Sequence, residues 1–348
     1  MPQAFPKTII IDVGKSWTKA FRVSNDKNKL VIEKKVSLPT TVGDISFSAD
    51  LLLKDLKATK QIPIVVTGSL PEAENLAKDL DGLYVDAYNA EDSFSKWLSK
   101  NDFKSPVFLS TGEYSYAANL KINQIGAFIT AEVNETDIEN YFGNKSLKPQ
   151  AIPTTPVDLE IEEAFYRVAF AHNKNFQNAK NVINIVVTGA FFSLDPQKSK
   201  LALIILDILS KGRVAQVKLD RYQFFHGFGA LLKKHPEIAD WETNFMQDLG
   251  AFISFGGRGR VMLDYGFTEN QELEITEDEI ALVPAPSKQK IEITFMEKEK
   301  KRVTLHGGSF GVLLDGRTKP LKIAFGRADS RAAMKRWQAA IEKVEMIE

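Results

Sequence analysis

A meander of three strand-like segments followed by helices occurs twice in this chain, and this repeat constrains the fold more than any other feature. The first copy consists of short apolar segments separated by turns: Thr8–Val13, Thr18–Val23 and Leu30–Val36. The second begins at Ser105 and consists of Pro106–Ser110, Ser115–Leu120 and Gly126–Ala131. Short apolar runs bounded by glycine, serine and asparagine are typical of strands. A length of 348 residues has room for two or three domains, so the repeat predicts two α/β subdomains.

Helical periodicity follows each meander. After the first we expect a helix near 49–58, a strand at Ile62–Thr67, a helix that opens at Ser69–Glu72 and another helix near 90–100. After the second we expect a strand at Val182–Val187 and four helices: 135–141, 157–172, 197–211 and 219–235. From Leu249 onward, short alternating runs separated by glycine and proline predict an antiparallel β domain, and a last amphipathic helix covers about 330–344. The expected boundaries are 1–104, 105–246 and 247–348.

Composition excludes several classes of protein and partner. Lysine plus arginine (45) equals aspartate plus glutamate (45), so no overall field favours nucleic acid or an anionic membrane. No apolar run approaches the roughly 18 residues needed to cross a bilayer. The absence of cysteine excludes disulfides, thiol nucleophiles and cysteine-ligated metals. The first residues contain no signal-peptide pattern, so we expect a cytoplasmic protein.

The strongest motif lies in the turn between the first two strands, Ile11–Lys19. Asp12 ends a strand, where its carboxylate can approach a hydrated Mg²⁺, and Gly14 lets the backbone come close to phosphate oxygens. Hydroxyls and ammonium groups that complement negative charge follow: Lys15, Ser16, Thr18 and Lys19. The alternative is an ordinary β-hairpin whose glycine has a positive φ.

Two further motifs follow later strands. Ser110, Thr111 and Gly112 follow the strand Pro106–Ser110, at the place where a second phosphate-binding turn is expected. Thr188, Gly189 and Ala190 follow the strand Val182–Val187, where a glycine turn can pass under a ribose and base. Each is also compatible with a plain turn between elements.

Other sequence motifs do not occur in the context that their usual function requires. Gly307–Gly311 satisfies G-x-S-x-G, but a strand rather than a helix is expected after it, which argues against a nucleophile elbow. The four histidines lack the tight spacing of metal ligands and are expected to be capping or surface residues. No Walker A sequence is present.

The two meanders and three motifs together resemble the superfamily that includes actin, the heat-shock chaperone ATPases and the sugar kinases. That resemblance implies two ribonuclease-H-like subdomains that bind ATP and Mg²⁺, with Asp12 directed at the metal. Members of the superfamily usually have an aspartate where Ser110 stands. The substitution predicts slow or absent hydrolysis, because that carboxylate orients the attacking water or the metal.

The chain is also similar to the glutamate mutase L family, in its forms with an added C-terminal β domain. The segments that carry this similarity lie between about 105 and 340: Asn144–Pro149, Ile152–Ala164, Val186–Ala190, Leu219–Arg221, Gly227–Leu231, Pro236, Gly307–Arg317 and Pro320–Leu321. The stretch between about 40 and 100 is shorter than the family leads one to expect. The resemblance implies a chaperone or reactivating partner of a cobalamin-dependent mutase.

Three functions therefore stay open. The first is an actin-like nucleotide-binding protein that signals nucleotide state to a protein partner. The second is a scaffold or filament protein without nucleotide binding, and the third is a small-molecule kinase, for which Glu132 and Glu135 are the candidate bases. The sequence does not establish the oligomeric state.

Overall fold

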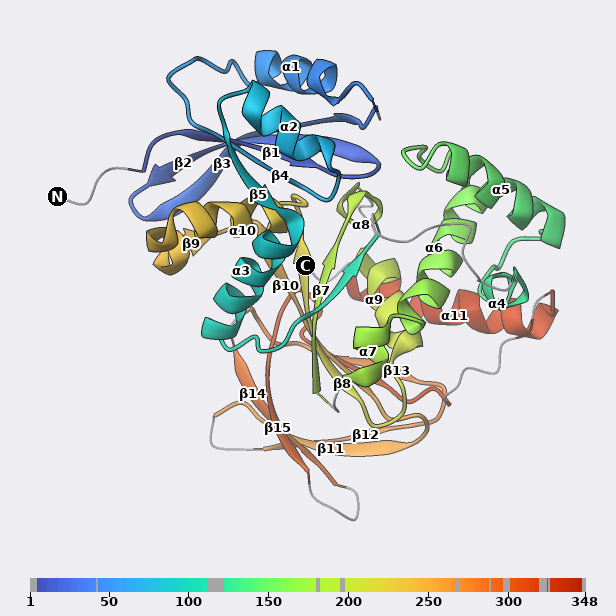
Figure 1. Cartoon of the computed structure of the whole chain (residues 1–348). Helices are drawn as coiled ribbons and strands as arrows, with labels where there is room; N and C mark the ends of the chain where they lie inside the picture. Colours follow the sequence, from blue (N-terminus) through green and yellow to red (C-terminus); the bar gives the residue numbers. More distant parts are fainter. Residues whose placement is uncertain are drawn as a thin grey trace. The chain divides into compact units, whose positions relative to one another are not determined.

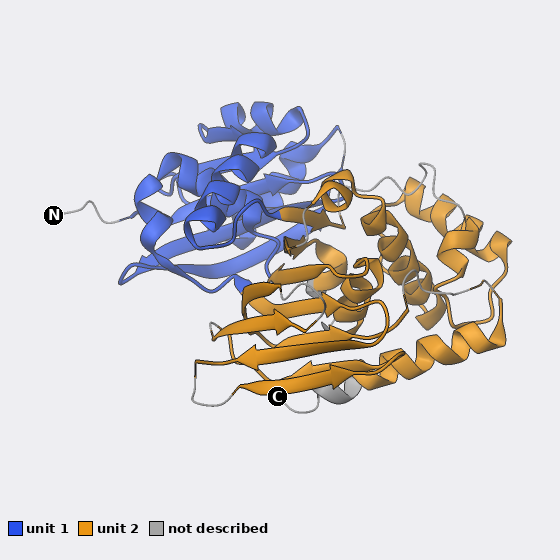
Figure 2. Ribbon diagram, turned by 90° about the horizontal axis from the view of Figure 1, so that it is seen from below, with its two compact units in different colours: residues 1–106, 220–246 blue, residues 107–219, 247–348 orange. Residues whose placement is uncertain are grey.

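The computed structural model describes residues 5–41, 43–111, 122–179, 182–194, 198–266, 270–287, 289–296, 301–318, 324 and 326–345. It is an α/β protein with several sheets, which confirms the predicted fold class (Figure 1). The chain divides into two compact units (Figure 2). Unit 1 comprises Met1–Pro106 and Asp220–Met246, and unit 2 comprises Val107–Leu219 and Gln247–Glu348.

Unit 1 contains a six-stranded sheet in the order β5-β4-β1-β2-β3-β9. Its strands are β1 (Thr8–Val13), β2 (Trp17–Asp26), β3 (Lys29–Pro39), β4 (Ile64–Gly68), β5 (Leu83–Asp86) and β9 (Glu242–Thr243). The first three strands pair antiparallel, which confirms the predicted meander. Strand β4 runs parallel to β1, and β5 runs parallel to β4. Three antiparallel strands followed by two parallel ones form the ribonuclease-H-like arrangement that the sequence predicts.

Helices cover both faces of this sheet. They are α1 (Ile45–Asp55), α2 (Glu72–Asp79), α3 (Ala87–Lys100), α10 (Phe225–Lys234) and the 3₁₀ turn η1 (Pro236–Asp240). Helices α1 and α2 share a buried cluster with alternate β1 residues, Ile9, Ile11 and Val13. Helix α10 lies on the opposite face, where Gly227 approaches Ile10. Alternation along β1 thus assigns Ile10 and Asp12 to the α10 face.

Residues 220–246 were expected in the second subdomain, and the structure places them in unit 1. Helix α10 packs on α3 so closely that a Cβ at Gly229 would lie 1.9 Å from the Ala90 carbonyl oxygen. Trp97 Nε1 donates to Ala239 O at 2.9 Å, and β9 pairs with the start of β3. The predicted helix over 219–235 is also wrong at its start, because β8 (Val214–Asp220) occupies that stretch.

Unit 2 contains a six-stranded sheet, in the order β13-β16-β10-β8-β7-β6, and a four-stranded antiparallel sheet, in the order β12-β11-β14-β15. The strands not yet introduced are β6 (Val107–Ser110), β7 (Val182–Thr188), β10 (Met246–Ser254), β11 (Gly259–Asp264), β12 (Gln271–Ile275), β13 (Ile280–Val283), β14 (Lys290–Phe295), β15 (Arg302–His306) and β16 (Val312–Asp315). The two sheets share one buried apolar cluster. The expected antiparallel β region is therefore present, but it continues the central sheet of unit 2 and is not a separate compact unit.

Helices pack against a second apolar cluster of unit 2. They are α4 (Ile122–Gly126), α5 (Glu135–Leu147), α6 (Pro156–Ala171), α7 (Lys174–Asn178), α8 (Ala190–Leu194), α9 (Lys198–Ile208) and α11 (Ala328–Glu345). Among the helices within the described ranges, none is long and apolar enough to cross a membrane.

The predicted strand over Gly126–Ala131 is wrong, because α4 ends at Gly126 and irregular backbone follows. The Glu160 carboxylate accepts hydrogen bonds from the backbone N–H groups of Thr130 (2.7 Å) and Ala131 (2.9 Å). A side chain thus binds two donors that a strand would offer to a neighbouring strand. The predicted strand Ser115–Leu120 lies outside the described residues.

Candidate functional site

A row of polar side chains crosses the sheet of unit 1 near the carboxyl end of β1. Asp12 is level with Lys19 on β2 and with Thr67 on β4, so the three side chains share the α10 face. Asp12 is 1% exposed, and Lys19 Nζ lies 2.7 Å from its Oδ2 atom. Thr67 is fully buried, and its Oγ1 has no hydrogen-bond partner among the residues the structure describes.

The turn that follows Asp12 is closed by backbone and threonine contacts. Gly14 N donates to Trp17 O at 3.1 Å, and a Cβ at Gly14 would lie 2.9 Å from that oxygen. Thr40 Oγ1 donates to Gly14 O at 2.7 Å and lies 3.0 Å from Thr18 Oγ1. Gly14 is not among the glycines with a positive φ, so a close approach rather than the hairpin conformation accounts for it. Thr40 N also donates to Ser16 O, at 2.9 Å.

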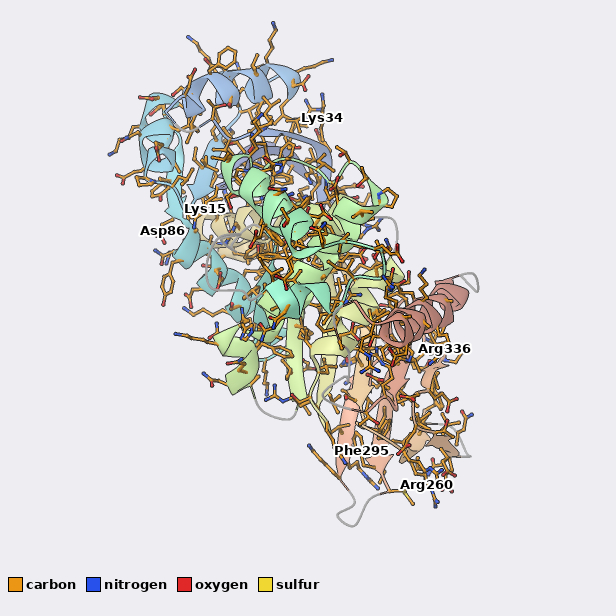
Figure 3. All side chains as sticks on the ribbon, turned by 90° about the vertical axis from the view of Figure 1, so that its right-hand side faces the viewer. Lys15, Lys34, Asp86, Arg260, Phe295 and Arg336 are labelled. Atoms are coloured by element: carbon orange, nitrogen blue, oxygen red, sulfur yellow. The ribbon has the colours of Figure 1, made fainter. Side chains whose placement is uncertain are left out.

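Lys15 and Lys19 differ in what they can contact. Lys15 is exposed at the turn, where Figure 3 labels it, and it is available to solvent and ligand. Lys19 is largely buried and is held by Asp12. The same ion pair decides how Mg²⁺ would be held. Because the Lys19 ammonium neutralises this single carboxylate, a hydrated Mg²⁺ would be held chiefly by phosphate and water. No described group of three or more acidic or histidine side chains forms a metal site.

Two titratable side chains outside the sequence motifs, Lys35 and His226, lie in the same electrostatic environment. Burial and, to a smaller extent, the charge of Lys19 together lower the pKa of Lys35 to about 8, against the opposing effects of Asp220 and Asp12. Burial lowers the pKa of His226 to about 4, and Asp12 opposes that shift. His226 is therefore neutral at pH 7 and is not the surface residue that was expected.

Asp220 fixes the start of the helix that carries His226. Its carboxylate accepts from the backbone N–H of Phe225 at 2.9 Å and from that of Tyr222 at 3.3 Å. The first bond satisfies an amide in the first turn of α10, which has no partner within the helix, and the second satisfies an amide just ahead of it. Asp220, in the segment Leu219–Arg221, thus helps to position the α10 face of the site.

The second and third motifs meet in unit 2. Ser110, which ends β6, is level with Thr188, which ends β7, and Thr111 N donates to Thr188 O at 3.2 Å. Gly189 has a φ of +114°, and a Cβ there would lie 2.0 Å from Thr111 Oγ1. Only glycine fits this conformation and this contact. Ala190 begins α8, and Gly112 lies outside the described residues.

A buried polar chain lies behind this turn. Tyr166 Oη is 3.4 Å from Thr111 O and 3.1 Å from Glu162 Oε1. Glu162 Oε2 accepts from Lys145 Nζ at 2.9 Å and from Tyr141 Oη at 2.5 Å. Because Glu162 and Lys145 are both buried, the pair fixes α5 against α6 and supports the residues behind the Thr111 turn.

The other sequence patterns have structural roles. Strand β16 begins directly after Gly307–Gly311, which confirms that this segment is not a nucleophile elbow. Ser309 Oγ accepts from Gln247 Nε2 at 2.7 Å. His172 follows α6 as its C-cap, as expected for a capping histidine.

Comparisons with known proteins give no family assignment. No family model matches the chain, and no curated protein matches it. Among solved structures, it is similar to an inorganic polyphosphate/ATP-glucomannokinase from Arthrobacter sp. strain KM (15% identity, 67% of this chain and 100% of that chain, TM-score 0.37). It is also similar to a PPX-GPPA enzyme from Aquifex aeolicus (11% identity, 68% and 82%, TM-score 0.28). Both TM-scores are low, so neither similarity indicates a function for this chain.

Proposed function

We propose that this protein binds a nucleotide through its phosphates at the turn Asp12–Lys19, and that it is an actin-like nucleotide-binding protein of the cytoplasm. The observation that carries the proposal is the row of Thr67, Asp12 and Lys19 on one face, at the carboxyl ends of parallel strands β1 and β4. Ligands of α/β sheets bind at that end of the strands. The turn adds the exposed ammonium of Lys15.

Taken by itself, the cluster of Ser110, Thr111 and Gly189 in unit 2 is a second candidate turn, one suited to a ribose and base. Its close backbone approach is the property that such a turn requires. Ser110 brings a hydroxyl and no carboxylate to the end of β6. We therefore propose binding with slow hydrolysis, and Mg²⁺ bound chiefly through the phosphates. A kinase has less support, because its candidate bases Glu132 and Glu135 are both exposed.

Calorimetry with ATP and ADP, each with and without Mg²⁺, tests the proposal. Asp12→Ala should remove most of the Mg²⁺-dependent affinity, because it removes the carboxylate directed at the metal and frees Lys19. Asp26→Ala is the matched control, since Asp26 is an exposed aspartate at the far end of β2. Equal binding by the wild type and the Asp12 variant would show that the site is misplaced. No binding by the wild type would favour the scaffold alternative.

A protein partner is the second part of this proposal, and one observation favours it. Leu147 is 83% exposed and Ile152 is 60% exposed, and both lie in the segments that resemble glutamate mutase L. Lys145 Nζ donates to Ala151 O, so the loop is tied to the buried Lys145–Glu162 pair. Exposed apolar side chains on a fixed loop suit protein contact.

The partner that the resemblance implies is a cobalamin-dependent mutase, and the comparisons do not support that identity. A binding assay with such a mutase tests it, using a Leu147→Ser/Ile152→Ser variant. Leu83→Ser is the control, because Leu83 is an exposed leucine of unit 1. If the purified mutase does not bind, the mutase role is wrong and nucleotide binding is unaffected.

A further inference from the structure

Lys35 lies on the ligand face of unit 1 because of an irregularity in β3. Arg22 is level with Lys34 and Val23 is level with Ile32, so Glu33 is an extra residue in β3. An extra residue reverses the alternation of side chains beyond it. Lys35 is consequently level with Phe21, on the same face as Ile32 rather than on the opposite one.

This position brings Lys35 next to the polar row of the site. Phe21 is level with Ile10 on β1, two residues before Asp12. Lys19 is level with Ser37, so Lys35 and Lys19 are diagonal neighbours on one face. Diagonal neighbours have Cβ atoms roughly 7 Å apart, within reach of long side chains.

Lys35 differs from its neighbour Lys34 in its contacts. Lys34, labelled in Figure 3, donates to Asp55 O at 2.8 Å and lies 3.8 Å from Asp55 Oδ1. Lys35 is half-buried, and its ammonium has no ion pair or hydrogen bond with any residue in the described part of the chain. A partly desolvated charge without such a partner is unfavourable unless a ligand supplies one.

The charges around Lys35 indicate that such a ligand carries negative charge. Lys19 on β2 and Asp12 on β1 neutralise each other. Asp220, which precedes α10, accepts backbone N–H groups. His226 on α10 is neutral at pH 7. Asp220 and Asp12 thus act on the ammonium of Lys35 only from a distance, and within the described residues it forms no ion pair of its own.

We propose that Lys35 pairs with a phosphate group of the ligand that binds over the Asp12 turn. This inference rests on the proposed function and assigns that site a binding residue from β3. The shared chemistry of the ligands is a phosphate chain, with or without a nucleoside.

Proton uptake is the consequence that distinguishes this role from a structural one. The pKa of Lys35 is about 8 without ligand, so roughly nine tenths of the protein has it charged at pH 7 and roughly one tenth at pH 9. A phosphate next to the ammonium raises that pKa. Binding at pH 9 should then take up close to one proton at Lys35, and binding at pH 7 only about a tenth.

Calorimetry in buffers of different ionisation enthalpy measures this uptake. The full chain is titrated with ATP, ADP and tripolyphosphate at pH 7 and pH 9, together with Lys35→Arg, Lys35→Met and the control Lys34→Met. Lys35→Arg should bind without the additional uptake at pH 9, because arginine stays charged. Lys35→Met should bind at least about tenfold more weakly at pH 7, and Lys34→Met should behave as the wild type.

Each outcome decides a different point. Uptake with all three ligands shows that phosphate alone suffices, and uptake with ATP and ADP only shows that a nucleoside is required. If Lys35→Met binds with the affinity of the wild type, or if proton uptake at pH 9 persists in Lys35→Arg, the role of Lys35 is wrong. Either result leaves the proposed function standing. Failure of the wild type to bind any of the three ligands overturns both. Circular dichroism verifies that each variant is folded.

Discussion

Arg317→Met is expected to cause one of the largest losses of stability that a single substitution can cause in unit 2. Arg317 is fully buried just after β16. Its Nε and Nη2 atoms bind Asp315 at 2.8 and 3.0 Å, and its Nη1 atom binds Asp207 of α9 at 2.7 Å. The guanidinium also lies 4.8 Å from the centre of the Trp337 ring of α11. One side chain therefore connects a strand end and two helices.

The expected loss follows from what remains after the substitution. Methionine replaces the apolar stem of the side chain but none of its donors. Asp207 would keep Arg167, whose Nε lies 2.8 Å away, and Asp315 would lose its contacts with a guanidinium. Removing one partner of a buried ion pair costs about 3–5 kcal/mol, because a buried charge is left uncompensated. Two carboxylates are affected here, so we expect the upper part of that range.

Urea unfolding at pH 7 measures this loss. Arg302→Met is the matched control, because Arg302 is an exposed arginine of unit 2 that pairs with Glu292 at 3.0 Å. Exposed pairs contribute less than about 1 kcal/mol, so the control should unfold almost as the wild type does. If Arg317→Met does not fold, Arg317→Lys retains the charge and allows the comparison. A loss below about 1 kcal/mol for Arg317→Met, or equal losses for both variants, would refute the reasoning.

Three further predictions concern the site. Gly189→Ala should destabilise unit 2 by more than about 1 kcal/mol, because it puts a Cβ 2.0 Å from Thr111 Oγ1 at a φ of +114°. Thermal unfolding checks this. Gly212→Ala is the control, because Gly212 also has a positive φ (+74°) but a Cβ there would have no neighbour within 4 Å. The wild type should release phosphate from ATP far more slowly than the ~10 per second typical of enzymes. A rate near that value in the wild type, which has Ser110 in place of an aspartate, would show that this serine does not slow hydrolysis. Lys35→Met should raise the free energy of unfolding at pH 7 by up to about 3 kcal/mol. The stability advantage of this variant over the wild type should shrink between pH 8 and 10.5. In that interval unfolded wild-type protein binds more protons than the folded form, so the wild type becomes more stable as the pH rises. A stability advantage that does not change with pH would show that Lys35 is not desolvated.

The sequence predicted those parts of the fold that depend on neighbouring residues. The meander β1–β3 follows from apolar runs and short turns, and the structure confirms it. The strands after Leu249 and the last helix follow from the same local signals. The strand after Gly311 excluded a nucleophile elbow for the same reason.

Long-range pairing accounts for what the sequence did not predict. The return of 220–246 to unit 1 depends on β9 pairing with Lys29 and Leu30, more than 200 positions earlier in the chain. No periodicity within 220–246 encodes that pairing. The error at Gly126–Ala131 has a similar origin, since the apolar residues there fit a strand and a carboxylate thirty positions later binds their backbone instead.

The candidate site shows the same division at the level of single side chains. Asp12, Gly14 and Lys19 lie close together in one β-hairpin, so a local pattern identifies all of them. Thr67 joins them only through parallel pairing with β4, which connects strands separated by a helix. Lys35 is harder still to identify, because simple alternation from Ile32 would assign Lys34 to the face of Asp12, and the extra residue Glu33 exchanges the two lysines. A Lys-Lys pair in a strand is typical of a solvated face, and only the register distinguishes the lysine that binds Asp55 from the one that shares the face of Asp12.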